Sequence, residues 1–121
     1  MEKRIVTYDL ETIKLCFSTV AKLRVTGTAL RDARLIGFSR EDMVKTIQEI
    51  KRSDFLKSMT TYADHRIWQD VYNTTYNGYV LYVKFQIDEE GHFVVSFNTD
   101  FHRPFKPNNL PLTKFEHLQS A

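Results

Sequence analysis

At 121 residues the chain is long enough for one domain with a single buried core and too short for two. With 42% hydrophobic and 13% aromatic residues it has a globular composition, which excludes a disordered chain, and a net charge of +2 does not by itself indicate a nucleic-acid binder. Cys16 is the lone cysteine and excludes an intramolecular disulfide, while no stretch approaches the ~20 apolar residues of a membrane span or begins with a secretory pattern. These features predict a cytoplasmic protein without a membrane span.

The first fifty residues carry apolar side chains at helical spacing. Asp9 is positioned to cap a first helix, and Val25 lies in a stretch that favours a short extended piece. A second helix is predicted over Ala29–Ile36, ended by Gly37 in the left-handed conformation, and a capping box over Ser39–Asp42 begins a third. The predicted inward positions are Leu10, Ile13, Phe17 and Val20 in the first helix, Leu30, Ala33 and Ile36 in the second, and Met43, Ile47 and Ile50 in the third. Each amphipathic helix therefore needs an apolar surface to lie on.

From about Met59 onward the apolar period changes from helical to two, which predicts a sheet. In residues 79–88 and 92–98, large apolar side chains alternate with more polar ones, so each strand has an apolar face and a polar face. The intervening Asp88–His92 is typical of a three-residue hairpin loop with Gly91 in the left-handed position.

This hairpin register pairs Tyr82 with Asn98 and Lys84 with Ser96, all on the polar face. A two-residue loop would break this pairing. The predicted fold class is therefore α+β: N-terminal amphipathic helices pack on one face of a C-terminal, mainly antiparallel sheet, and the other face stays exposed. We expect the chemistry on that exposed face.

The segment Asp54–Tyr72 concentrates hydrogen-bonding side chains among aromatics. These side chains are Lys57, Ser58, Thr60, Thr61, Tyr62, Gln69 and Tyr72. A cation with many donors suits an anionic, base-bearing ligand better than a metal. The four histidines, His65, His92, His102 and His117, do not have the spacing of metal ligands, so no metal or cofactor site is predicted.

The same segment resembles, almost letter for letter, the signature of the motility quorum-sensing regulator (MqsR) toxins. The matching residues are Phe55, Lys57-Ser58-Met59-Thr60-Thr61-Tyr62, Asp64-His65 and Ile67-Trp68-Gln69-Asp70-Val71-Tyr72. Members of this family are small bacterial endoribonucleases of toxin–antitoxin pairs, with a fold similar to the RelE-type RNases. The resemblance extends over roughly residues 1–98 and is looser in the helical part.

The resemblance implies catalytic roles for three residues. Lys57 is expected to stabilise the negative charge that builds on the phosphate oxygens and is a candidate for moving protons; Tyr82 would transfer a proton or hold the phosphate, and Gln69 would position sugar or base. The family has a fourth residue, a lysine near the end of the last strand. Here Asn98 stands in its place and carries no charge.

Losing one positioned charge from such a site costs about a hundred- to a thousandfold in rate, so either the activity is weak or another cation substitutes. Lys84 is the nearest candidate because it shares a strand face with Tyr82, although an ordinary solvent-side lysine is an equal alternative. Arg66 and Arg103 are less constrained by the pattern. Lys84, Arg66 and Asn98 are thus the predicted substrate-binding residues.

Two further features leave alternatives open. Trp68 would either stack on an RNA base or anchor the sheet to a helix, the second being the more common role of a lone tryptophan. Residues 99–121 lie beyond the resemblance and combine all three prolines of the chain with six large apolar residues. We expect residues 1–98 to form the toxin-like domain and residues 99–121 a C-terminal extension docked on it.

Two main hypotheses follow. The first is the toxin of a type II toxin–antitoxin system, a metal-independent endoribonuclease that cleaves single-stranded mRNA and is inhibited by a cognate antitoxin. The resemblance implies an antitoxin with a helix-turn-helix domain, through which alone the pair would contact DNA. The second is a non-catalytic RNA- or antitoxin-binding module, weakened by Asn98. A structural α+β adaptor is a weaker third. A cation within reach of Lys57 and Tyr82 would favour the enzyme.

Overall fold

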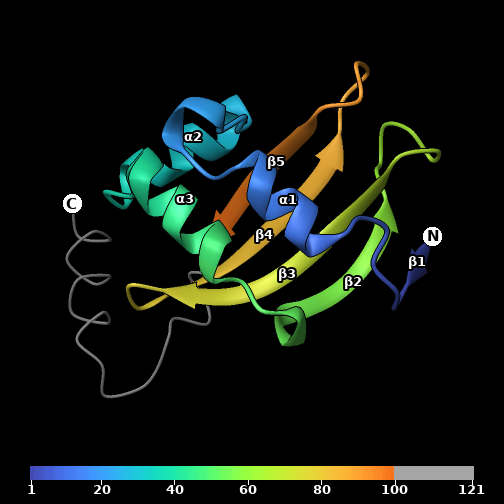
Figure 1. Ribbon diagram of the computed structural model, residues 1–121, viewed down its shortest axis with the longest axis horizontal. Helices are drawn as coiled ribbons and strands as arrows, with labels where there is room; N and C mark the ends of the chain where they lie inside the picture. The colour runs from blue at the N-terminus through green and yellow to red at the C-terminus, as the bar shows by residue number, and fades with distance from the viewer. Residues whose placement is uncertain (100–121) are drawn as a thin grey trace.

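The computed structural model describes residues 1–99, which form three helices against one antiparallel sheet of five strands (Figure 1). The helices are α1 (Leu10–Cys16), α2 (Gly27–Leu35) and α3 (Arg40–Glu49), with short 3-10 turns η1 (Val20–Lys22) and η2 (Arg52–Asp54). The strands are β1 (Glu2–Lys3), β2 (Phe55–Thr60), β3 (Trp68–Tyr76), β4 (Tyr79–Ile87) and β5 (Phe93–Thr99), in the spatial order β1-β2-β3-β4-β5. The predicted α+β class is confirmed.

The expected helix caps at Asp9 and Ser39 are present. Asp9 Oδ2 accepts the backbone N–H of Thr12 at 3.0 Å, which satisfies one of the free amides at the start of α1. At the start of α3, Ser39 Oγ accepts the Asp42 N–H at 3.1 Å, and Asp42 Oδ2 accepts the Ser39 N–H at 2.8 Å. This reciprocal pair is the predicted capping box, and Gly37 has the expected left-handed φ of 71°.

Two helix boundaries differ from those predicted. α1 ends at Cys16, so Val20 lies in the separate turn η1 instead of continuing the helix. α2 begins two residues before Ala29, because Thr26 Oγ1 accepts the Ala29 N–H at 3.2 Å and so caps a helix that starts at Gly27. Phe17 is buried in the core as predicted, whereas Val20 is only half-buried and Leu30 packs on the core while partly exposed. Ala29, which was not among the predicted inward positions, is buried.

The β4–β5 hairpin has the predicted register. The Asp88 N–H donates to the His92 carbonyl at 2.8 Å, and Gly91 adopts the left-handed φ of 83°. Tyr82 pairs with Asn98, and the next pair on the same face is Lys84 with Ser96, as expected.

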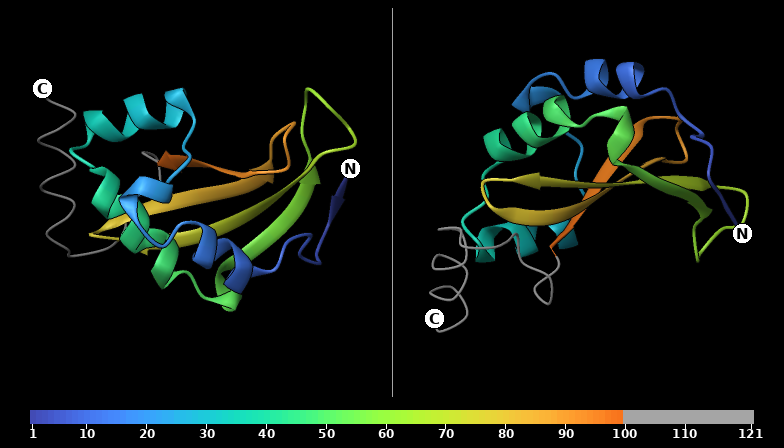
Figure 2. Two further views of the ribbon diagram at one scale, coloured as in Figure 1. Left: turned by 45° about the horizontal axis from the view of Figure 1, so that its top comes forward. Right: turned by 90° about the horizontal axis from the view of Figure 1, so that it is seen from below.

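All three helices bury their apolar sides in one core. α1 and α3 lie over one face of the curved sheet, and α2 packs against β5 at its edge (Figures 1 and 2). The core includes Ile13 from α1, Ala33 from α2, Met43 from α3, and the alternating strand residues Val83 and Val95. On the opposite sheet face, the alternate β4 residues Val80, Tyr82, Lys84 and Gln86 are only half-buried, which leaves that face available for a ligand.

The N-terminus departs from the predicted order of helices first and sheet second. β1 pairs with β2, Glu2 opposite Met59 and Lys3 opposite Ser58, so a strand precedes the helices. The predicted extended piece at Val25 is confirmed as a parallel bridge to Val95 on the outer edge of β5.

Within the described part of the chain, no helix is long and apolar enough to cross a membrane. The predicted extension over residues 99–121 lies, apart from Thr99 at the end of β5, outside the described residues, as does Arg103.

Candidate active site

The sheet face opposite the helices, here called the open face, brings the predicted site residues into neighbouring rows. One row crosses four strands, since Lys57 pairs with Val71, Val71 with Lys84, and Lys84 with Ser96. Strands lie about 4.8 Å apart, so the Cα atoms of Lys57 and Lys84 are separated by about 10 Å. Both ammonium groups project from the same face, which makes this row the cationic strip of the sheet.

The adjacent row holds the phenol. Asn73 pairs with Tyr82, and Tyr82 pairs with Asn98. Tyr82 is two residues from Lys84 on β4, a rise of about 6.6 Å along the strand. Tyr82 and Lys84 are half-buried and Asn98 is exposed, so a ligand on the open face would reach all three.

A β-bulge at Leu56 directs Lys57 onto the open face. Phe55 pairs with Tyr72, but the next pair is Lys57 with Val71, so Leu56 is the extra residue. In a regular strand, residues two apart share a face, and Phe55 and Lys57 would then point the same way. The bulge lets Phe55 pack on the core ring of Tyr72, centroids 5.5 Å apart, while Lys57 faces outward.

Glu2 is a member of the site that the sequence analysis missed. Its Oε2 lies 3.1 Å from Lys57 Nζ, and the lysine side chain retains 27% of its exposure. The Lys57 ammonium, through its hydrogen bond and its charge, lowers the pKa of the Glu2 carboxyl. Glu2 was missed because β1 could not be predicted: its two residues are too short to show a periodic pattern.

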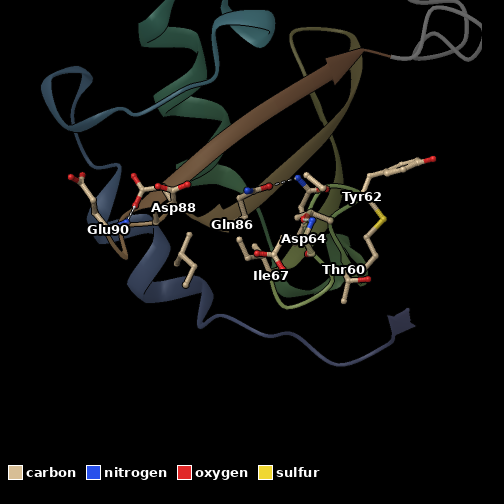
Figure 3. A pocket seen from close by; sticks show the side chains of 13 residues that line it. Thr60, Tyr62, Asp64, Ile67, Gln86, Asp88 and Glu90 are labelled. Carbon is tan, nitrogen blue, oxygen red and sulfur yellow. Dashed lines mark hydrogen bonds between the residues drawn. The ribbon is translucent and has the colours of Figure 1, made fainter.

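Gln69 lies in a third row of the open face and is hydrogen-bonded to Gln86. The Gln69 Nε2 donates to Gln86 Oε1 at 2.9 Å, across β3 and β4. Both amides line a hollow of about 1010 Å³ between the β2–β3 and β4–β5 loops (Figure 3). Gln86 was visible in the sequence as a polar-face residue of its strand, but only the β3–β4 register pairs it with Gln69.

Arg66 does not join the cationic strip. It lies in the β2–β3 loop with 90% of its side chain exposed, and its guanidinium binds both carboxylate oxygens of Asp64 at 3.1 Å. Asp64 raises the pKa of Arg66, and in return Arg66 lowers the pKa of Asp64. The pair serves to hold the loop, so Lys84 is the better placed of the two substitute cations considered.

Trp68 lies on the helix-covered side of the sheet. It pairs with Thr60, two residues before the buried Asp70, and therefore shares that residue's face. The Lys3 Nζ is 4.2 Å from the centroid of the Trp68 ring, a cation–π contact. The Trp68 backbone carbonyl accepts a hydrogen bond from the Tyr8 hydroxyl at 2.7 Å. Of the two predicted roles, the geometry favours anchoring, here of the N-terminal segment to the sheet.

Asp70 fixes that N-terminal segment from inside the protein. Its fully buried carboxylate accepts the backbone N–H groups of Thr7 at 3.0 and 3.1 Å and of Tyr8 at 2.9 Å. Burial, and secondarily the Asp70 charge, raises the pKa of Tyr72 to about 12 and also raises that of Tyr8. Because the residues after β1 are tied down in this way, Asp70 helps to hold Glu2 near Lys57.

One loop of the described chain gathers possible metal ligands. Single ligand atoms of Asp88, Glu90 and His92 lie within 4.8 Å of one another. However, Asp88 Oδ1 already accepts the backbone N–H groups of Glu90 and His92, both at 2.9 Å, and these bonds lower the pKa of Asp88. The hydrogen bonds of the β4–β5 turn account for this gathering.

Comparison with known proteins finds a matching family and a similar toxin. The family described as "Motility quorum-sensing regulator, toxin of MqsA" matches residues 6–99. The chain is also 43% identical, over 72 residues, to the mRNA interferase toxin MqsR of Escherichia coli (strain K12), an alignment that covers 60% of this chain and 72% of that protein. The matched family range includes the whole cationic strip, Tyr82 and Gln69. The chain belongs to the MqsR toxin family.

Proposed function

We propose that this protein is the toxin of a toxin–antitoxin pair: a metal-independent endoribonuclease that cleaves single-stranded mRNA and is held inactive by a cognate antitoxin. Membership of the MqsR toxin family and the similarity to an mRNA interferase support the class of activity. The observation that carries it is the juxtaposition of Lys57, Lys84 and Tyr82 on one uncovered sheet face.

The reaction that these groups suit is intramolecular transesterification of an RNA phosphodiester. The 2′-oxygen loses its proton and attacks the adjacent phosphorus, and the bond from phosphorus to the 5′-oxygen breaks as that oxygen gains a proton. The products are a 2′,3′-cyclic phosphate and a 5′-hydroxyl. Lys57 and Lys84 would stabilise the charge on the non-bridging oxygens, and the Tyr82 phenol would exchange a proton with one of the reacting oxygens.

The alternative, a binding module without catalysis, rests on Asn98, which lacks the charge of the family lysine. Asn98 lies directly opposite Tyr82, so the missing charge would have been adjacent to the phenol. Lys84 is one pair along on the same face and offers an ammonium to the same phosphate. Because Lys84 can replace the charge that is missing at Asn98, we favour the enzyme over the binding module.

The family also supports a partner and a location. A toxin of this kind requires an antitoxin, which we propose to carry a helix-turn-helix domain that would make all DNA contacts of the pair. We place the protein in the cytoplasm, where its mRNA substrate is translated. The Glu2 carboxylate, 3.1 Å from Lys57 Nζ, supports the idea that an antitoxin carboxylate would bind the same ammonium.

The proposal is tested by incubating purified, antitoxin-free protein with an unstructured RNA in EDTA and mapping the cut ends. Cleavage should leave 5′-hydroxyl ends, which a kinase labels directly, and 2′,3′-cyclic phosphates. Lys57→Ala should lower the rate by about a hundredfold or more, since it removes a charge and leaves the core intact. Lys45→Ala, an equal change on the exposed side of α3, is the control. A requirement for Mg²⁺ or Mn²⁺, or equal rates for Lys57→Ala and the parent, would reject this mechanism.

A further inference from the structure

The hollow next to Gln69 has a different chemistry from the cationic strip. Its lining includes the carboxylates of Asp64, Asp88, Glu89 and Glu90, and among the described residues that line it there is no lysine or arginine. A phosphate would therefore gain nothing from entering it. The open face is divided into a positive region, which suits the RNA backbone, and a carboxylate-rich hollow, which suits an uncharged group that donates hydrogen bonds.

The amide pair gives the hollow a defined edge. The bond from Gln69 Nε2 to Gln86 Oε1 uses one donor and one acceptor, so the pair still offers the Gln69 carbonyl oxygen as an acceptor and the Gln86 NH₂ as a donor. Both side chains are half-buried, which limits their freedom to rotate. In Figure 3, Gln86 lies between the loop carboxylates of Asp88 and Asp64.

The hollow lies about one nucleotide spacing away from the cationic strip. Gln69 precedes Val71 by two residues along β3, and Gln86 follows Lys84 by two along the antiparallel β4, so each amide is displaced by about 6.6 Å to the same side of the row of Lys57. A phosphate held by that row would therefore place one of its two neighbouring bases over the amide pair.

The β2–β3 loop supplies a rigid rim. Thr61 Oγ1 donates to the Asp64 carbonyl at 2.8 Å and accepts the Asp64 N–H at 3.1 Å, while Arg66 grips the Asp64 carboxylate. This closed loop presents the side chain of Tyr62, which is 100% exposed. A fully exposed aromatic ring at the edge of a polar hollow is suited to stacking on a base.

Resting on the proposed nuclease function, we propose that the hollow and its Gln69–Gln86 pair form a nucleobase site that selects a base with an exocyclic amino group over uracil. Adenine, cytosine and guanine each carry an amino group that donates to an amide oxygen or a carboxylate. Uracil instead presents two carbonyl oxygens, which the carboxylates of the hollow repel, and its single donor is the N3–H. Gln69 then offers the amide oxygen that accepts from the amino group, and Gln86 is a positioning residue that holds the Gln69 amide in that orientation.

The test uses chimeric oligonucleotides with a single ribonucleotide, so that only one phosphate is cleavable. The base on either side of that phosphate is varied among A, C, G and U, with inosine and purine riboside as analogues that lack the amino group. At one of the two positions, kcat/KM should be about tenfold or more higher for amino-bearing bases than for uracil or the analogues. Affinities for fully 2′-O-methylated, uncleavable oligonucleotides should follow the same order.

Two variants separate reading from stacking. Gln86→Leu should bring the preference to within about twofold of none, whereas Thr75→Ala, at the far end of the open face, should keep it. Tyr62→Ala should weaken all substrates by a similar factor, about tenfold, because stacking tolerates any base. Parent protein that cleaves with no base preference at either position, or a folded Gln86→Leu that retains the preference, overturns the inference. Base-selective binding without cleavage would instead reject the nuclease proposal and support the base site. If Gln86→Leu fails to fold, the inosine and purine riboside substrates alone test whether the amino group is recognised.

Discussion

Lys57 Nζ and Glu2 Oε2 are 3.1 Å apart, so the lysine proposed to meet the scissile phosphate is already paired with a carboxylate. Glu2 reaches the lysine because β1 places it opposite Met59, on the same open face. The phosphate of an RNA substrate and the Glu2 carboxylate therefore compete for one ammonium. Exposed ion pairs are weak, which makes this contact easy for a substrate to displace.

Glu2→Gln should strengthen RNA binding by removing this competitor. We expect KM for a short RNA to fall by about two- to fivefold at low ionic strength, with the gain shrinking in high salt. Glu11→Gln, which makes the same charge change on α1, is the matched control. A KM unchanged by Glu2→Gln, together with a lower kcat, would show that Glu2 orients Lys57 rather than competing with substrate.

Asp70→Ala should destabilise the protein because it leaves the amides of Thr7 and Tyr8 without their buried acceptor. We expect the free energy of unfolding to fall by about 2–4 kcal/mol, measured by urea denaturation. Asp32→Ala, on the exposed side of α2, should change it by less than about 0.5 kcal/mol. Equal effects of the two substitutions would mean that the N-terminal segment does not depend on Asp70.

Stability should decline in alkali through Tyr72. Its pKa is about 12 in the folded protein and about 10 in an unfolded chain, so its contribution is complete below pH 10. Between pH 10 and 12 the unfolded chain loses the phenolic proton while the folded protein keeps it, which lowers the free energy of unfolding by up to about 2–3 kcal/mol. Tyr72→Phe should flatten this part of the urea-unfolding profile against pH. Tyr62→Phe, a change at a fully exposed ring, should leave it as steep as in the parent.

Local chemistry made much of the fold predictable from the sequence. Asp9 and the Ser39–Asp42 box mark helix starts, Gly37 and Gly91 mark left-handed turns, and each signal depends only on its neighbours. The three-residue hairpin loop then fixed the β4–β5 register, and with it the opposition of Tyr82 and Asn98. The α2 boundary was missed because Thr26 is a cap followed by Gly27, a residue that disfavours helix.

What escaped prediction depends on contacts between distant segments. Glu2 meets Lys57 only because β1 adds to β2, 55 residues away in the chain. The bulge at Leu56 appears only once β2 is aligned with β3, since nothing in the local sequence marks the extra residue. Trp68 was assigned to either of two roles because its face follows from the same alignment. The sequence thus indicated which residue types form the site, whereas their register required the sheet.

The position opposite Tyr82 offers the sharpest test of how the site compensates for its missing lysine. Asn98 is exposed on the open face, so Asn98→Lys would add an ammonium beside the phenol without disturbing the core. If no other cation serves the same phosphate, single-turnover cleavage should rise by about tenfold or more, given the usual effect of such a charge in the transition state. Thr28→Lys, which adds the same charge on exposed α2, controls for general attraction of RNA.

The partner experiment is Lys84→Ala, because Lys84 shares the cationic strip with Lys57 and lies two residues from Tyr82. If Lys84 already supplies the charge, Lys84→Ala should be as damaging as Lys57→Ala, about a hundredfold, and the gain from Asn98→Lys should be small in the parent but large in the Lys84→Ala background. A double-mutant cycle of Asn98→Lys and Lys84→Ala measures this coupling. Additive effects would mean that the two positions act on different phosphates, and no effect of either would remove this part of the sheet from the reaction.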